Sequence, residues 1–127
     1  MSKKRWTNWQ QPQIEDGVPT KWGWVVKHSD KFHLGKDTDI GFGTYINAKA
    51  GVFIEDDVQI GSHGSIYSVN TIDETHGIIR LKKNCKIGSH VIIMPGVTIG
   101  ENSIVGAFSL VKNDVPANKT VYGNPVI

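Results

Sequence analysis

The stretch IGSHVIIMPGVTIGENSIVG, residues 87–106, decides the fold of this chain. A bulky aliphatic residue recurs at every sixth position in it. In the unit Val97-Thr98-Ile99 the first and third side chains of a short strand point to the same face, and Gly100 then permits a sharp corner. Each hexapeptide is therefore expected to form one short strand followed by one turn.

The same spacing extends outward through most of the chain. The bulky positions are Leu34, Ile40, Ile46, Ile54, Ile60, Ile66, Ile72, Leu81, Ile87, Ile93, Ile99, Val105 and Val111. All steps are six residues except two, which carry two extra residues before Ile54 and three before Leu81, and we expect turns to bulge outward there. Many units also carry an apolar residue two positions earlier, namely Val52, Val58, Ile79, Val91 and Val97.

A single unit of this size cannot bury its own apolar row, so successive units must coil and stack at ~4.8 Å. The repeat thus predicts an all-β fold, a parallel β-solenoid. Three hexapeptides would close one triangular coil, which gives about four coils and places Ile40, Ile60, Leu81 and Ile99 on one wall. Periodicity does not fix the handedness, and the usual rule for parallel crossovers is right-handed.

The amino-acid composition agrees with a turn-rich all-β domain. Among 127 residues there are 15 Ile and 13 Val but only 3 Leu and 4 Ala. β-Branched residues favour strands, which argues against a helical bundle. Fourteen glycines and five prolines supply turns, and a hydrophobic share of 39% is too high for a disordered chain.

Charge, hydropathy and cysteine content exclude several other classes. A net charge of +2 is too even to indicate nucleic-acid binding. No apolar run is long enough for a membrane span, and the first residues are polar rather than a signal core. The single cysteine, Cys85, forms no internal disulfide and supplies no zinc cluster. These features predict a cytoplasmic protein.

Two segments lie outside the regular repeat. Residues 1–33 hold all four tryptophans, Trp6, Trp9, Trp22 and Trp24, and we expect them to form an N-terminal cap on a solenoid spanning residues 34–127. Alternatively, one or two of these indole rings line an acceptor pocket, as aromatic faces do for sugars. The second segment is an inserted loop at about 68–78, and a break in a rigid stack is where functional residues are commonly placed.

The sequence resembles the hexapeptide-repeat acyltransferases. The resemblance rests on residues 87–107 and on the ending, Asn113-Asp114-Val115-Pro116 and Gly123-Asn124-Pro125, which is specific for the sugar acetyltransferase branch. It implies a left-handed β-helix, an exception to the usual handedness rule. It also implies a homotrimer that binds acetyl-CoA, without a metal, in clefts between neighbouring subunits.

Acyl transfer requires a base, and histidine is the usual one. We expect His63, at a corner one turn before the loop, to be the first candidate, followed by His76 within the loop and by His90, which repeats the His63 pattern. The resemblance places the catalytic histidine near the start of the loop, where this chain has Val69-Asn70-Thr71. Asn70 is a candidate for orienting an amine acceptor, and Asp73 and Glu74 are candidates for binding sugar hydroxyls or an ammonium.

The donor site is expected in the C-terminal coils. The resemblance suggests that Ser89, Ala107 and Ser109 line a groove for the pantetheine arm, and that Lys112 and Asn113 face its phosphates. Cys85 lies two residues before Ile87, an inward position, so we interpret it as a small buried apolar residue rather than a nucleophile.

The leading functional hypothesis is an acetyl-CoA-dependent acyltransferase. Its acceptor would be the amine or hydroxyl of a sugar, most simply a nucleotide-linked amino sugar used for surface glycans. One alternative is a noncatalytic scaffold that uses the solenoid only for trimerisation. Another is a zinc carbonic anhydrase, which binds metal through three histidines, and for which His28 and His33 have a suggestive spacing.

Overall fold

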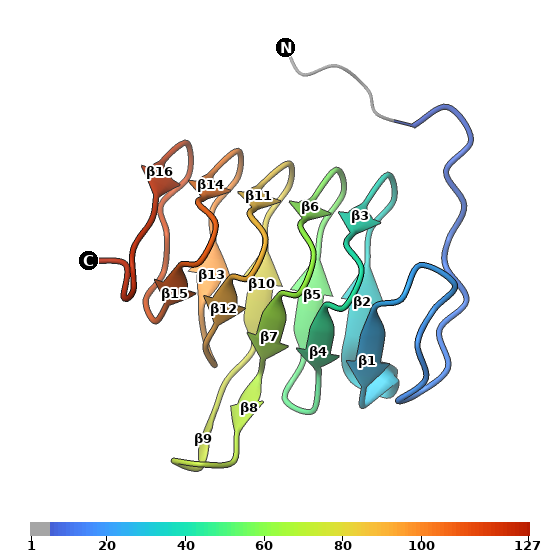
Figure 1. The fold of residues 1–127 in the computed structure, drawn as a ribbon, viewed down its shortest axis with the longest axis horizontal. Helices are drawn as coiled ribbons and strands as arrows, with labels where there is room; N and C mark the ends of the chain where they lie inside the picture. The colour runs from blue at the N-terminus through green and yellow to red at the C-terminus, as the bar shows by residue number, and fades with distance from the viewer. Residues whose placement is uncertain (1–5) are drawn as a thin grey trace.

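The chain forms a solenoid with three walls of short parallel strands (Figure 1). The computed structural model describes residues 6–127, so the first five residues of the expected cap lie outside the described part. Wall 1 consists, in spatial order, of β1 (Val25–Lys27), β4 (Tyr45–Asn47), β7 (Ser65–Tyr67), β12 (Ile92–Ile93) and β15 (Leu110–Val111). Wall 2 consists of β2 (Phe32–Leu34), β5 (Val52–Ile54), β10 (Ile79–Leu81) and β13 (Thr98–Ile99). Wall 3 consists of β3 (Asp39–Ile40), β6 (Gln59–Ile60), β11 (Lys86–Ile87), β14 (Ile104–Val105) and β16 (Thr120–Val121). The predicted all-β parallel solenoid is confirmed.

The chain visits walls 1, 2 and 3 in turn, and we name the connections corner 1–2, corner 2–3 and corner 3–1. The first corner 1–2 contains a short 3-10 helix, η1 (Ser29–Lys31), and a later one gives rise to a hairpin of β8 (Val69–Asn70) and β9 (Thr75–His76). Walls 1 and 3 contain five strands each, against the four or so coils expected. The additional strand in wall 1 is β1, which lies inside the segment that the sequence assigns to the cap.

One position of the expected repeat is wrong. Ile72 was taken as a repeat position, but its side chain is 92% exposed in the hairpin, and the chain passes from Ile66 in wall 1 directly to Leu81 in wall 2. The predicted ladder of Ile40, Ile60, Leu81 and Ile99 is accordingly divided between two walls. The error arises because the hairpin is long enough to contain an isoleucine in phase with the repeat by chance.

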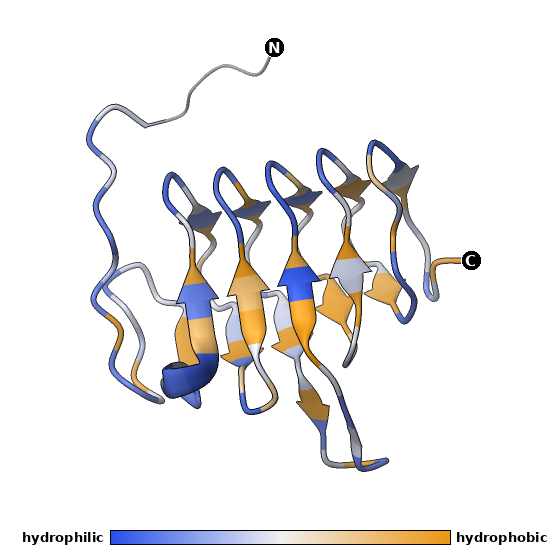
Figure 2. Ribbon diagram, turned by 180° about the vertical axis from the view of Figure 1, so that it is seen from behind, coloured by the Kyte–Doolittle hydropathy of each residue, from blue (hydrophilic) through white to orange (hydrophobic). Residues whose placement is uncertain are grey.

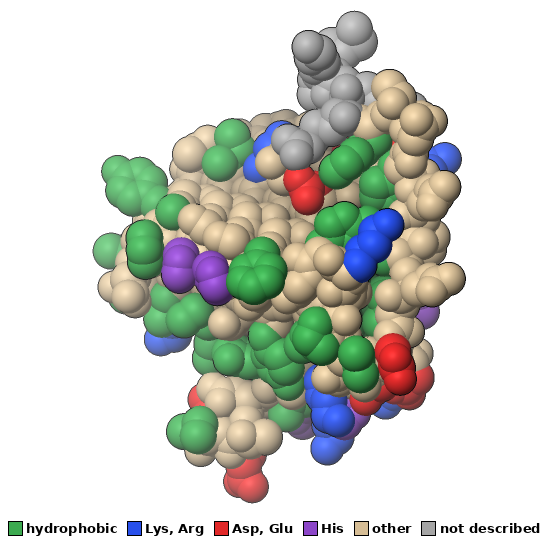
Figure 3. All heavy atoms as spheres, turned by 45° about the vertical axis from the view of Figure 1, so that its right-hand side comes forward, with side chains coloured by type: hydrophobic (Ala, Val, Ile, Leu, Met, Phe, Trp, Pro, Cys, Tyr) green, Lys and Arg blue, Asp and Glu red, His purple; other side chains and the backbone are tan. Residues whose placement is uncertain are grey.

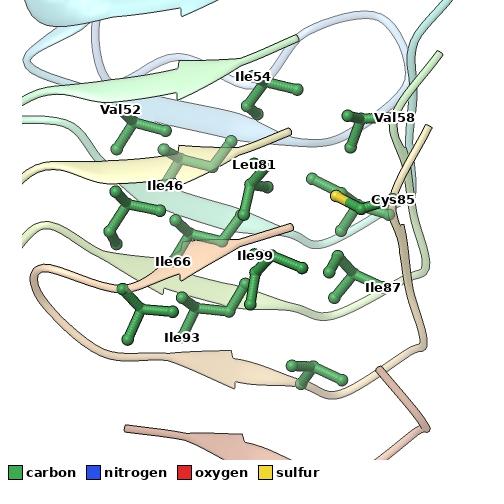
Figure 4. Packing of buried hydrophobic residues seen from close by; sticks show 14 of the residues in the cluster. Ile46, Val52, Ile54, Val58, Ile66, Leu81, Cys85, Ile87, Ile93 and Ile99 are labelled. Atoms are coloured by element: carbon green, nitrogen blue, oxygen red, sulfur yellow. The ribbon is translucent and has the colours of Figure 1, made fainter. Parts of the chain in front are cut away.

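The core is built from inward-pointing ladders that run the length of the solenoid (Figure 4). In wall 1, Ile66 is paired on one side with Ile46 and on the other with Ile93, and all three are almost completely buried. The apolar residues expected two positions earlier, such as Val58 and Val97, are buried as well. Burial of these β-branched side chains between the walls is the main stabilising contribution.

The corners fix how closely successive coils approach. A Cβ atom added to Gly61 would lie 2.7 Å from the backbone nitrogen of Ser89 in the next coil, so only glycine fits there. At corner 2–3 the amide of Asn84 donates to Asn102 at 2.8 Å, and the amide of Asn102 donates to Asn118 at 3.2 Å. Seen from the other side, the turns at the top of the view are mostly polar, and the strands carry both apolar and polar residues (Figure 2).

The N-terminal segment covers the first coil. Trp24 is buried at this end of the core, with its ring centroid 6.2 Å from that of Phe32. The backbone of Gly17 donates to Val26 at 2.8 Å, which holds the segment against β1. Among residues 6–127 there is no helix long and apolar enough to cross a membrane.

Candidate functional site

The hairpin β8–β9 is the largest departure from the regular solenoid (Figure 1). At its base the backbone of Gly77 donates to the carbonyl of Ser68 at 2.9 Å. The hydroxyl of Ser68 is buried; it donates to the carbonyl of Asn47 at 2.7 Å and accepts from the amide of Ala50 at 3.0 Å. The base of the hairpin is thereby fixed to the preceding corner 1–2, while its tip extends away from the walls.

Polar side chains shape the turn of the hairpin. The Oδ1 atom of Asn70 accepts a hydrogen bond from the backbone of Ile72 at 3.1 Å. The carboxylate of Asp73 accepts from the hydroxyl of Thr75 at 2.7 Å and from its backbone at 3.1 Å. These two bonds, the hydroxyl first, lower the pKa of Asp73, so this exposed carboxyl stays ionised at neutral pH. Both candidate residues therefore have acceptor oxygens engaged in the turn.

His76 lies on β9, directly opposite Val69 in the antiparallel register. Its side chain is exposed, and within residues 6–127 no hydrogen bond or ion pair involves its imidazole. Asn70 is paired with Thr75, the neighbour of His76, so the hairpin brings two of the expected site residues within a few positions of one another. Side chains on adjacent positions point to opposite faces of such a ribbon.

His63 lies elsewhere, at a corner 3–1. Its imidazole is stacked on His90 of the next coil with centroids 5.1 Å apart, and His90 is stacked on Phe108 at 4.9 Å. On its other side His63 meets the edge of Phe42 at 5.8 Å. We call these four residues the corner ladder. The structure thus separates His63 from the hairpin, because the two lie at opposite ends of β7.

The expected donor residues are also divided between two corners. Ser89 and Ala107 occupy equivalent places in successive corners 3–1. Ser109 is buried; its hydroxyl donates to Gly106 at 2.7 Å and accepts from Gly123 at 3.1 Å. Its hydroxyl is therefore engaged within the protein.

Lys112 and Asn113 are exposed and follow β15 at corner 1–2, on the same row of corners as the hairpin.

The remaining titratable candidates have distinct surroundings. His28 precedes η1 in a left-handed conformation, whereas His33 lies outward on wall 2, where its ring stacks on Phe53 at 4.4 Å. Burial raises the pKa of the Cys85 thiol to about 12, as expected for an unreactive core residue. Within residues 6–127 no three His, Cys, Asp or Glu side chains are arranged to hold a metal ion.

The outer face of wall 1 carries an apolar band, formed by Tyr45, Tyr67, Ile92 and Leu110. The rings of Tyr45 and Tyr67 have centroids 6.0 Å apart, and burial raises the pKa of Tyr45. Figure 3 shows two histidines (purple) among hydrophobic side chains (green), with further hydrophobic groups below them. Ile92 is 38% exposed, so the band leaves apolar surface accessible on this wall.

Residues 79–113 match the family model described as bacterial transferase hexapeptide (six repeats). The matched segment covers the coils from β10 to β15, in which the six-residue spacing is unbroken. This part of the chain is similar to the hexapeptide-repeat transferases. The hexapeptide-repeat architecture also accounts for the similarity of the chain to solved structures over most of its length.

Three proteins to which this chain is similar are described as acetyltransferases. The galactoside O-acetyltransferase of Lactococcus lactis is 33% identical over 72% of this chain and 51% of its own length. The acetyl-CoA complex of a hexapeptide-repeat containing acetyltransferase of Vibrio cholerae has a TM-score of 0.77 at 27% identity, covering 82% of this chain and 62% of the other. A maltose O-acetyltransferase of Clostridium difficile has a TM-score of 0.75 at 28% identity, covering 83% and 62%. The chain thus spans about half the length of the galactoside relative.

Sequence reasoning did not find the aromatic members of the corner ladder. Phe42 follows Gly41 by one residue, whereas His63, His90 and Phe108 each follow the corner glycine by two. A comparison of the residues two positions after the corner glycine would have revealed three of the four members, because these positions stack in register.

Proposed function

We propose that this chain is an acetyl-CoA-dependent acetyltransferase that transfers an acetyl group to a hydroxyl or amine of a sugar. The observation that carries the proposal is the hairpin β8–β9, which leaves an otherwise regular solenoid and carries an exposed imidazole. Its support comes from the named relatives, since two are sugar O-acetyltransferases and a third was solved with acetyl-CoA.

Within this proposal, His76 is the general base. The corner ladder favours His76 over His63, because the place of His63 in its coil is taken by His90 and Phe108 in the next two. Stacking between coils accounts for an aromatic ring at His63, His90 and Phe108 alike. Because phenylalanine cannot accept or donate a proton, this row of rings does not require a catalytic base. His76 has no such structural role among the described residues, and it lies beside the turn that Asn70 and Asp73 shape.

The reaction balances with these groups. The Nε2 or Nδ1 atom of His76 takes the proton of the acceptor hydroxyl, whose oxygen attacks the thioester carbonyl carbon. The tetrahedral intermediate collapses by breaking the carbon–sulfur bond, and the imidazolium returns its proton to the sulfur of coenzyme A. For an amine acceptor the same base removes the proton after attack. Asn70 lies on the opposite face of the ribbon from His76, so it is not proposed to act on the same amine.

The donor is proposed to lie along the later coils. Ser89 and Ala107 offer small side chains and backbone groups at corner 3–1. Ser109 is buried, with its hydroxyl and its carbonyl engaged within the protein, so it is proposed to support this corner rather than to touch the donor. Lys112 and Asn113 would face the phosphates at corner 1–2. Within one chain the residues at corner 3–1 and those at corner 1–2 lie at different edges of the solenoid. We therefore propose that the donor cleft combines corner 3–1 of one subunit with corner 1–2 of a neighbouring subunit.

The proposed assembly is a homotrimer. The apolar band on wall 1 supports it, because exposed Ile92 and the two tyrosines on the same face of the wall would be covered by a neighbouring subunit. The proposed location is the cytoplasm, where acetyl-CoA is available. Among acceptors, neutral galactosides and maltose are suggested by the relatives' names, and a nucleotide-linked amino sugar is the narrower proposal from the sequence.

The decisive experiment is a thiol-release assay with acetyl-CoA, maltose, lactose and a nucleotide-linked amino sugar as acceptors. We expect His76→Ala to lower kcat about a hundredfold, the usual contribution of a general base. His63→Ala and His90→Ala form a matched control pair, because both remove one ring from the corner ladder, and each should retain most of the activity.

Either of two results would overturn this proposal. Normal turnover of His76→Ala with a large loss in His63→Ala alone would transfer the role of base to His63. Failure of the folded protein to bind acetyl-CoA in a calorimetric titration would exclude the acetyltransferase altogether and leave a noncatalytic scaffold. Sedimentation analysis of the same sample tests the trimer independently.

A further inference from the structure

A hollow of about 790 Å³ lies between the N-terminal segment and the start of wall 3. It is lined by all four tryptophans of the chain and, on the solenoid side, by residues 38–40, which include β3. Its volume falls within the range of small-molecule sites. The hollow is separate from the hairpin, which leaves the solenoid between β7 and β10.

The walls of the hollow are held in place by hydrogen bonds. The indole nitrogen of Trp9 donates to the carbonyl of Thr38 at 2.8 Å, joining the segment to the solenoid. A tight turn closes the other side, where the backbone of Thr20 donates to Trp24 at 2.8 Å and that of Gly23 donates to Thr20 at 2.9 Å. Trp24 is itself anchored in the core. The aromatic faces are therefore positioned before any ligand enters.

One polar group in the hollow is unsatisfied. Thr20 lines the hollow and is only 9% exposed, and its hydroxyl has no hydrogen-bond partner among the described residues. Buried hydroxyls are nearly always hydrogen-bonded, because an unpaired one loses its hydration without compensation. A ligand hydroxyl placed in the hollow would supply the missing partner.

The lining specifies the chemistry of the ligand. Indole faces attract the C–H faces of a sugar ring, and neutral amides bind its hydroxyls. The amides are those of Asn8, Gln10, Gln11 and Gln13. Among the described residues of the lining, Lys21 is the one basic side chain, and its ammonium lies 4.7 Å from the ring of Trp22, so the described lining supplies no cluster of cations for a phosphate.

We infer that this hollow is a binding site for a neutral sugar, distinct from the site of acetyl transfer. The inference goes beyond the proposed function and does not depend on it, since it rests only on the lining of the hollow. If acetyl transfer to a glycan also takes place, the hollow would hold a sugar unit at a distance from the reacting one.

Intrinsic fluorescence tests the inference directly, because every tryptophan of the chain lines the hollow. The full chain is titrated with maltose, lactose and N-acetylglucosamine in the absence of acetyl-CoA. We expect a saturable change for at least one sugar with a dissociation constant in the low millimolar range, the affinity expected when one hexose unit of about a dozen heavy atoms enters the hollow. No saturable change with any of the three would overturn the inference.

Two variants locate the binding. Thr20→Val keeps the shape but removes the hydroxyl, so we expect about fivefold weaker binding together with an unchanged or higher melting temperature. Trp22→Ala removes a half-exposed indole and should weaken binding further in a calorimetric titration. Ile72→Ala, an exposed apolar change on the hairpin, is the matched control and should bind normally. Unaltered affinity in both Thr20→Val and Trp22→Ala would show that sugar binds elsewhere.

A loss of acetyl transfer in His76→Ala with normal fluorescence titration would show that the two sites are independent.

Discussion

The sharpest test of the register compares two isoleucines that the sequence places in the same repeat. Ile93 is completely buried in wall 1 between Ile66 and Val111, whereas Ile72 is 92% exposed in the hairpin. Changing Ile93 to Ala removes three buried carbons, worth about 2.4 kcal/mol at about 0.8 kcal/mol per methylene. The cavity left behind adds to this, so we expect a total of about 3.5 kcal/mol. Ile72→Ala should cost less than about 0.5 kcal/mol.

Urea unfolding followed by circular dichroism measures both values. With an m-value of about 2 kcal/mol per molar, Ile93→Ala should lower the midpoint by about 1.7 M and Ile72→Ala should leave it unchanged. Both variants are compared at one protein concentration, because subunit association would contribute to stability. Similar losses in the two variants would show that Ile72 belongs to the repeat and that the register described here is incorrect.

Three further predictions concern single groups. Because burial raises the pKa of Cys85 to about 12, its thiol should react with a thiol reagent at pH 8 only as fast as the protein unfolds, which a rate measurement with and without denaturant checks. Thr75→Val should raise the lowered pKa of Asp73, measured by NMR titration; the ionised carboxylate supports the hairpin above the usual carboxyl range, and this support is lost as the pH falls through the lowered pKa. Gly61→Ala should destabilise the protein by about 1–3 kcal/mol in thermal melts, because its Cβ would meet the backbone of Ser89 at 2.7 Å.

Much of the fold follows from residues close together in the sequence. The unbroken spacing from Leu81 to Val111 predicts strands, corners and inward positions correctly, because each coil repeats the same local geometry. Only the first strand of the first coil, β1, was missed, because η1 separates β1 from β2 and breaks the spacing before Leu34. Ile72 was misassigned because a period of six cannot distinguish a repeat from a loop residue that happens to be in phase.

The candidate site was harder to predict. The sequence identifies an inserted loop at about 68–78 that contains Asn70 and His76, since an insertion into a regular repeat is visible without a structure, but it does not show that this loop is a hairpin. It also ranks His63 first, but it cannot show that His63 stacks within a ladder of rings contributed by four separate coils. Likewise, nothing in the local sequence shows that the hydroxyl of Ser109 is engaged by Gly106 and Gly123.

By itself, the sequence determined the architecture of this protein: a six-residue apolar period, with glycine where coils approach closely, can be buried only by stacking parallel coils. Only the tertiary structure decided which corner each polar or aromatic group occupies. The reason is that a corner's neighbours come from coils many residues away in the chain. An irregular insertion of a few residues, such as the hairpin at 68–78, therefore changes which side chains meet without altering the local pattern on either side.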